Sequence, residues 1–179
     1  MPSNKLKSTL HFHFIVFIFG FTAILGKLIS IDAVSLVWYR MVLATAVVAL
    51  FMGIRRISFT LSTKQLYIML ICGVLIALHW VFFFHAVKLS NVSVTLSVMS
   101  AGAMVTALFE PIFYKRSFVW YEIVLGMIVV VALGLILQTE YHYIEGMMFA
   151  FFAILLSVAF TLINGKSIHK SDARVMSVY

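Results

Sequence analysis

The sequence predicts an all-α polytopic membrane protein, and three observations support this fold class. Apolar residues fill 64% of the 179 positions and charged residues only 11%, whereas soluble domains average roughly half apolar and about a quarter charged. The apolar residues form unbroken runs that would surround a helix on every side. Each run reaches the length of about 20 residues that a bilayer core requires. A water-soluble fold is therefore excluded, and lipid must surround most of the surface.

Six hydrophobic segments meet this length requirement. They are residues 10–30, 34–53, 65–87, 91–113, 119–138 and 144–168. A transmembrane β-barrel would instead show alternating stretches of about ten residues. The first segment follows Lys5 and Lys7 as a signal peptide would, but it is longer and lacks a small-residue cleavage site, so we expect a retained membrane helix.

Basic residues alternate between successive connections and predict the orientation. Ten of the thirteen fall on the N-terminal side of the membrane: Lys5, Lys7, Arg55, Arg56, Lys64, Lys115, Arg116, Lys166, Lys170 and Arg174. The opposite side carries Lys27, Lys88, Asp32, Glu140 and Glu145. By the positive-inside rule the N-terminus is cytoplasmic, and we expect a bacterial cytoplasmic (inner) membrane. The net charge of +7 is thus a topology signal and predicts no nucleic-acid partner.

The sixth hydrophobic segment begins to repeat the first. Residues 21–29 read FTAILGKLI and residues 160–168 read FTLINGKSI, with six of nine positions identical. Membrane helices are built mainly from a few apolar residue types, so chance explains matched Phe and Ile more readily than matched Thr, Gly and Lys. An odd number of helices in the repeat unit turns the next unit upside down, as in many transporter folds. We therefore expect a five-helix unit at 1–143 and the start of an inverted second unit at 144–179.

A resemblance to a known family follows from this layout. The second segment carries Trp38-Tyr39-Arg40 near its start, the third ends in the sequence FHAVKLSNVS at 84–93, and the fifth contains Gly126. With these features the chain resembles an EamA-type carrier of the drug/metabolite transporter superfamily along nearly its whole length. Members typically have ten helices in two such units. The resemblance thus implies a carrier that is truncated within its second unit.

The chain departs from this family pattern at two places in the fourth segment. Many members have a proline midway, where this chain has Ser100-Ala101-Gly102-Ala103, and a Gly-Glu pair at the inner end, where this chain has Glu110-Pro111. Substrate-site details of the family are therefore not carried over to this chain.

Polar residues inside the spans are the candidate solute site, because such residues are costly in lipid and usually functional. At about 1.5 Å per residue, several of them lie at one depth, about 9 to 13 Å from the predicted outer ends. The predicted substrate-binding residues are Arg40, His79, Trp80, Ser97, Ser100 and Thr22. A guanidinium can hold a carboxylate through two hydrogen bonds, which favours an amino acid or another small anionic metabolite.

Structural roles compete with these assignments. Arg40 could extend to the outer interface or pair with Asp32. His79 could pack against a neighbouring carbonyl, or could titrate and couple proton movement to solute movement. Trp80 could be a packing residue. Glu110 is expected to form an ion pair with Lys115 or Arg116 at the inner boundary.

The fourth segment carries two polar stripes, and we expect one to pack and the other to line the solute path. Thr95 and Gly102 lie on one side of the helix, and Ser93, Ser97 and Ser100 lie on the other.

The leading functional hypothesis is a secondary transporter that moves small organic solutes, such as metabolites, amino acids or drug-like compounds, by alternating access. Coupling to protons is left open. The expected partners are membrane lipid and a small-molecule solute, with a homodimer as an option; no cofactor or metal is expected. The alternatives are a non-transporting assembly subunit and, with less support, a membrane-embedded enzyme. An enzyme would need an acid/base or metal cluster, and the sequence shows none.

Overall fold

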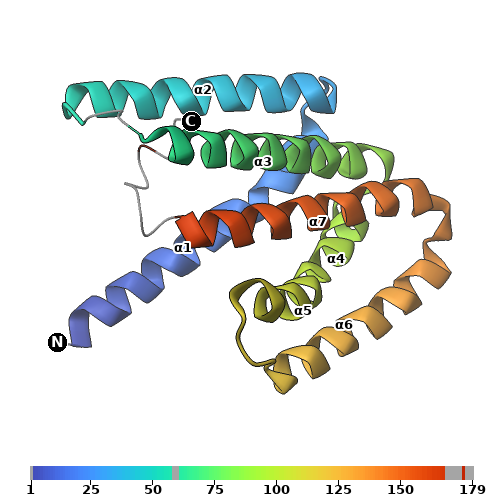
Figure 1. The fold of residues 1–179 in the computed structure, drawn as a ribbon. Helices are drawn as coiled ribbons and strands as arrows, with labels where there is room; N and C mark the ends of the chain where they lie inside the picture. Colours follow the sequence, from blue (N-terminus) through green and yellow to red (C-terminus); the bar gives the residue numbers. More distant parts are fainter. Residues whose placement is uncertain (1, 58–60, 168–174, 176–179) are drawn as a thin grey trace.

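The computed structural model in Figure 1 describes residues 2–57, 61–167 and 175. These residues form helices and no strands: α1 (Pro2–Leu28), α2 (Ala33–Ile54), α3 (Thr63–Leu89), α4 (Val92–Ser100), α5 (Gly102–Tyr114), α6 (Trp120–Thr139), the 3-10 helix η1 (Tyr141–Tyr143) and α7 (Ile144–Ser167). Ile168, Lys170 and Arg174, which belong to the predicted sixth segment and its flank, lie outside the described residues. The predicted all-α fold class is confirmed.

Six helical spans within the described residues are long and apolar enough to cross a membrane: Lys5–Leu28, Ala33–Ile54, Thr63–Leu89, Val92–Tyr114, Trp120–Thr139 and Tyr141–Ser167. Their boundaries agree with the predicted segments to within a few residues. Large apolar side chains such as Phe17, Leu43 and Val131 are more than half exposed on these helices. Such a surface is stable in lipid, where each helix satisfies its own backbone hydrogen bonds. The chain is therefore an integral multi-pass membrane protein.

Side-chain caps explain where α2 and α3 begin. The Asp32 carboxylate accepts hydrogen bonds from the Ser35 backbone N–H, at 3.0 Å, and from the Ser35 hydroxyl. These bonds hold the pKa of Asp32 below its ordinary value. Before α3, Ser62 and Gln65 form a reciprocal capping box. Because caps satisfy the first N–H groups of a helix, each helix can start directly after a short connection.

The fourth span is broken at Ala101, between α4 and α5. The Ser100 hydroxyl donates to the Ser97 carbonyl at 2.6 Å, and the Ala101 N–H donates to the Val98 carbonyl at 3.0 Å. Ser and Gly residues are common at helix kinks, and here Ala101 lies between Ser100 and Gly102. The span at 91–113 was predicted correctly, but its break was not.

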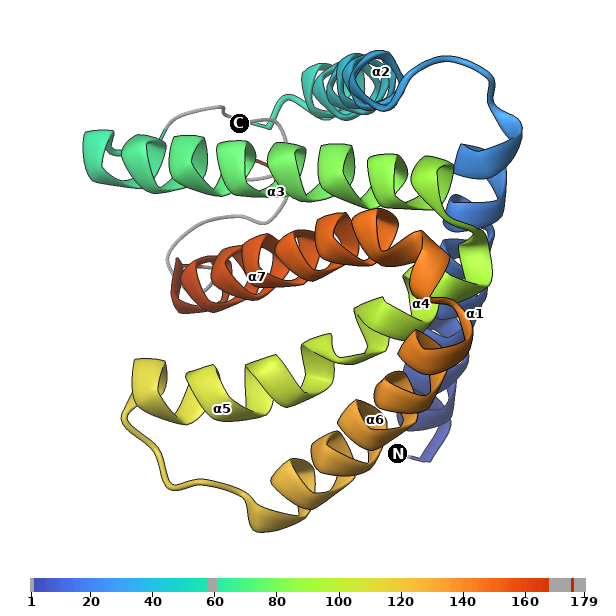
Figure 2. The same cartoon turned by 90° about the vertical axis from the view of Figure 1, so that its right-hand side faces the viewer.

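The helices are arranged in a row, which Figure 2 shows as α2, α3, α7, α5 and α6 in succession, with α1 crossing one end of the row. Helix α7 packs along α3 through small residues. Ala86 of α3 and Ala150 and Ala153 of α7 are fully buried, and a Cβ at Gly146 would lie 2.8 Å from the Ser90 Cβ. Small residues permit close helix contact in lipid. The helix that begins the predicted second repeat is thus packed into the first five-helix unit.

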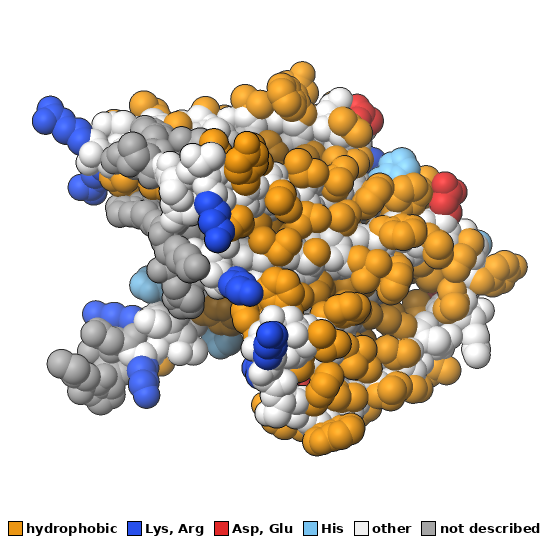
Figure 3. Space-filling view, in the orientation of Figure 1, with side chains coloured by type: hydrophobic (Ala, Val, Ile, Leu, Met, Phe, Trp, Pro, Cys, Tyr) orange, Lys and Arg blue, Asp and Glu red, His pale blue; other side chains and the backbone are white. Residues whose placement is uncertain are grey.

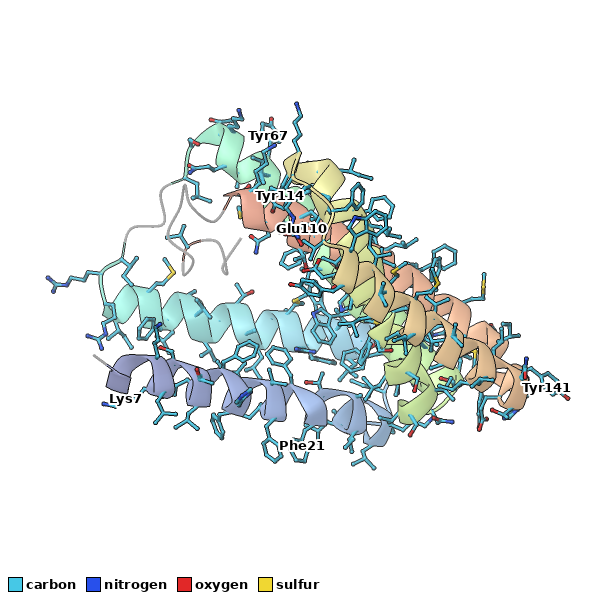
Figure 4. The ribbon with its side chains drawn as sticks, turned by 90° about the horizontal axis from the view of Figure 1, so that it is seen from below. Lys7, Phe21, Tyr67, Glu110, Tyr114 and Tyr141 are labelled. Carbon is cyan, nitrogen blue, oxygen red and sulfur yellow. The ribbon has the colours of Figure 1, made fainter. Side chains whose placement is uncertain are left out.

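Charged residues separate toward the two ends of the helices. On the face drawn in Figure 3, most Lys and Arg side chains lie in the left half and toward the lower middle, the acidic ones lie mainly toward the right, and most of the remaining surface is apolar. Figure 4 shows Glu110 and Tyr114 near Tyr67 at one end, with Tyr141 at the other. At the basic end Glu110 pairs with Arg116 at 3.2 Å, so the expected interfacial ion pair is present.

Candidate functional site

A cavity of about 720 Å³ lies between α1 and α2. Phe84 of α3 contributes to its wall, and most of the remaining lining is aliphatic, for example Leu25 and Leu43. Thr22 and Arg40, two of the residues predicted from the sequence, both line it. Small-molecule sites have this character, with apolar walls and a few placed polar groups, and volumes of roughly 300 to 1,000 Å³.

Arg40 is held inside this cavity wall by aromatic side chains of α3. Its Cζ lies 3.9 Å from the Trp80 ring centroid and 6.0 Å from that of Phe84. The two rings stack on each other at 5.6 Å. The aromatic face attracts the cation. Asp32 is not its partner, because that carboxylate is bonded to Ser35 instead.

Arg40 also carries an unsatisfied donor. In the part of the chain that the structure describes, its Nη1 is the one buried side-chain nitrogen or oxygen without a hydrogen-bond partner. An unsatisfied buried donor costs about 1 to 3 kcal/mol, and a cation–π contact returns about 0.5 to 2 kcal/mol. None of the described residues that line the cavity is acidic. The arrangement is an apolar cavity whose described lining carries one cation, Arg40, and no acidic side chain.

His79 is buried and faces α7. Its Nδ1 lies 2.8 Å from the Ala153 carbonyl oxygen. A carbonyl can only accept, so Nδ1 carries the proton, and in the neutral ring Nε2 is the basic nitrogen. The imidazole meets the Trp80 ring edge to face at 5.0 Å. His79 therefore joins α3 to α7 and supports Trp80, while the cavity lining does not include it.

Ser97 and Ser100 lie on α4, outside the lining of this cavity. Ser97 is half-buried and Ser100 is exposed. The other stripe of the same span packs, as Thr95 is fully buried with its Oγ1 3.0 Å from the Ser90 Oγ. The structure thus brings Thr22, Arg40 and Trp80 together with His79 behind them, and separates the two serines.

Three residues around the cavity were missed in the candidate site. Gly26 lies against Phe84, and a Cβ at Gly26 would come within 3.0 Å of two carbons of that ring. Lys27 donates from Nζ to the Val87 carbonyl at 2.9 Å and to the Ser90 carbonyl at 2.8 Å. These contacts fasten one end of α1 to the C-terminal end of α3. The Gly-Lys pair that occurs in both the first and the sixth hydrophobic segment was the sequence signal that could have identified Gly26 and Lys27.

Other features among the described residues are weaker candidates for a functional site than this cavity. No group of three or more His, Cys, Asp or Glu side chains among them could hold a metal ion. A second cavity, of about 320 Å³ between α5 and α7, has only apolar lining residues, so it has no group to orient a solute. The cysteine Cys72 is buried in α3.

Comparisons with known proteins agree with the architecture. The model of the EamA-like transporter family matches residues 9–138, a stretch that runs from within α1 to within α6 and covers well over half of the chain. No curated protein and no solved structure matches the chain.

Proposed function

The chain belongs to the EamA-like transporter family, and on this premise we propose that it is a secondary transporter of small organic solutes that works by alternating access. The observation that carries this proposal is the cavity between α1 and α2, whose described lining includes one charged side chain, Arg40, with a buried Nη1 that has no hydrogen-bond partner. A cationic donor left unsatisfied inside lipid is costly, so its retention favours a ligand-binding role.

Each predicted site residue has a place in this proposal. Arg40 binds the acceptor group of the solute, and Thr22 adds a hydroxyl from the facing helix α1. Trp80 holds the guanidinium in position from behind. Ser97 and Ser100, on the open face of α4, line the path beyond the cavity.

Proton coupling is assigned to His79. Its Nδ1 is committed to the Ala153 carbonyl, so Nε2 would take up the proton, and the resulting charge would act on Arg40 through Trp80. We expect an imposed pH gradient to drive solute uptake by the wild type and to leave uptake by His79→Gln unchanged. Solute uptake by His79→Gln that still responds to the pH gradient would contradict this assignment.

The proposed orientation places the N-terminus in the cytoplasm of a bacterial cell, with the chain in the cytoplasmic membrane. The separation of charges to the two helix ends supports it. In a Cys72→Ala background, a membrane-impermeant maleimide added to intact cells should label His142→Cys and spare Lys64→Cys. Labelling of Lys64→Cys but not of His142→Cys would show the opposite orientation in the membrane.

Flux through reconstituted protein tests the function itself. Proteoliposomes containing the wild-type chain should take up at least one of labelled benzenesulfonate, phenylalanine or benzyltrimethylammonium saturably and faster than protein-free vesicles. These probes cover an anion, a zwitterion and a cation on one aromatic body. Arg40→Gln should abolish that flux while the variant still inserts into the membrane. Flux of none of the three would favour the non-transporting assembly subunit.

A further inference from the structure

We infer that the Arg40 cavity selects organic monoanions, in which one carboxylate or sulfonate is attached to an apolar body, over zwitterions, dianions and cations. This inference deepens the proposed function and rests on it. It is narrower than the expectation from the sequence, which included amino acids.

The number of charges in the cavity sets the number of charges on the ligand. Arg40 is the one charged side chain among the described lining residues, and its Nη1 has no partner. One anionic group in contact with the guanidinium would neutralise its charge. A second anionic group on the same ligand would be buried against aliphatic walls without a counter-charge, which is strongly unfavourable. The geometry therefore disfavours dianions.

An ammonium group finds no counter-charge in the same cavity. The described lining contains no Asp or Glu, and an exposed Asp32 near the start of α2 is already bonded to Ser35. The neutral hydroxyls of Thr22 and Tyr39 are the side-chain acceptors in the described lining. Aromatic faces can also bind ammonium, but Arg40 covers the Trp80 ring at 3.9 Å and Tyr39 is mostly exposed. A zwitterion would thus bury one charge without a counter-charge.

The apolar cavity walls favour an apolar body on the ligand beside its anionic group. Leucine and valine side chains such as Leu25, Leu43 and Val47 line the same cavity as Arg40, and the volume of about 720 Å³ far exceeds what a small inorganic anion fills. Burial of an apolar body against these walls would add favourable contact. The ligand class is therefore an amphipathic monoanion.

Four ligands with one phenyl body test the charge rule by equilibrium binding to the purified full chain. They are 3-phenylpropanoate, its 2-ammonium derivative phenylalanine, its 2-carboxylate derivative benzylmalonate, and phenethylamine. We expect 3-phenylpropanoate to bind at least about tenfold more tightly than each of the others, the loss that one unpaired buried group produces. Equal or tighter binding of phenylalanine, benzylmalonate or phenethylamine would overturn the inference, and this comparison requires no variant.

Three variants locate the site. Arg40→Gln should weaken 3-phenylpropanoate binding by about tenfold or more, and Arg40→Lys by less, since it keeps the charge but loses the planar fork. Ala44→Trp, which leaves Arg40 unchanged and adds an indole ring to the cavity wall, should also weaken binding. Unchanged binding by both Arg40→Gln and Ala44→Trp would show that the ligand is held elsewhere and would refute the inference.

Binding and flux together separate this inference from the transport proposal. Binding of 3-phenylpropanoate without flux of any of the three labelled probes would refute transport and retain the ligand class. Saturable uptake of phenylalanine in preference to benzenesulfonate would refute the ligand class and retain transport.

Discussion

Gly26→Ala tests whether the contact between α1 and Phe84 holds the cavity wall in place. The added Cβ would come within 3.0 Å of two Phe84 ring carbons, so the ring would have to move. Phe84 is only 2% exposed and is stacked on Trp80, so little free space is available. Overpacking of this kind costs about 1 to 3 kcal/mol. Alanine gains up to about 1 kcal/mol through its higher helix propensity, which leaves a net loss of up to about 2 kcal/mol and a deficit of about 1 to 3 kcal/mol relative to an unhindered Gly→Ala exchange.

Gly20→Ala is the matched control on the same helix, because a Cβ at Gly20 meets no atom within 4 Å. It should leave stability unchanged or raise it by up to about 1 kcal/mol. Both free energies can be measured by unfolding in mixed detergent micelles, followed by tryptophan fluorescence. The displaced ring should also disturb Trp80 and Arg40, so Gly26→Ala should bind 3-phenylpropanoate more weakly than Gly20→Ala. Equal stability and equal binding of the two variants would refute the reasoning.

Three further contacts, away from the cavity lining, are probed by substitution. Lys27→Met should lower the free energy of unfolding by about 1.5 to 3 kcal/mol, the scale of hydrogen bonds to a charged group, because its ammonium donates to the Val87 and Ser90 carbonyls. Lys166→Met is the control and should lower it less, because the Lys166 ammonium lies 5.3 Å from a ring centroid; equal losses would contradict this. The bonds from Ser35 lower the pKa of Asp32, so its stabilisation of α2 should be present at neutral pH and lost as the pH falls through that lowered pKa. Asp32→Asn should remove this pH dependence from hydrogen exchange in the first turn of α2, and persistence of the dependence would argue against the cap. His79→Phe should cost about 0.5 to 1.7 kcal/mol of unfolding free energy through loss of the bond to α7, and an unchanged value would show that the bond contributes nothing.

The membrane spans could be predicted because their length and composition are local properties. Each span needs about 20 apolar residues whatever surrounds it. The break at Ala101 is different, since the Ser100 hydroxyl can bond to the preceding carbonyl or point elsewhere, and only the folded chain decides between them. The Ser-Ala-Gly-Ala sequence was noticed as a departure from a family pattern, and its bending was not foreseen.

The placement of the candidate site residues was predicted in part, because distance along a helix gives depth but not direction. Arg40 and Thr22 were placed at a similar depth and do line one cavity. Ser97 and Ser100 were placed at that depth as well, yet α4 presents them away from it. The contact of Arg40 with Trp80 and that of His79 with Ala153 depend on how the helices rotate about their axes. Helices that are apolar on every side give little information about rotation.

The central claim is that the Arg40 cavity opens alternately to the two sides of the membrane. Thr22→Cys in a Cys72→Ala background places one thiol in that cavity, and Val130→Cys, exposed on the apolar surface of α6, is the control. The measurement is the rate of modification by a membrane-impermeant anionic thiol reagent added to either side of sealed vesicles of known orientation. We expect modification of Thr22→Cys from both sides, slowed by 3-phenylpropanoate, and no modification of Val130→Cys. Modification from one side alone, or at the rate of the α6 control, would contradict alternating access at this cavity.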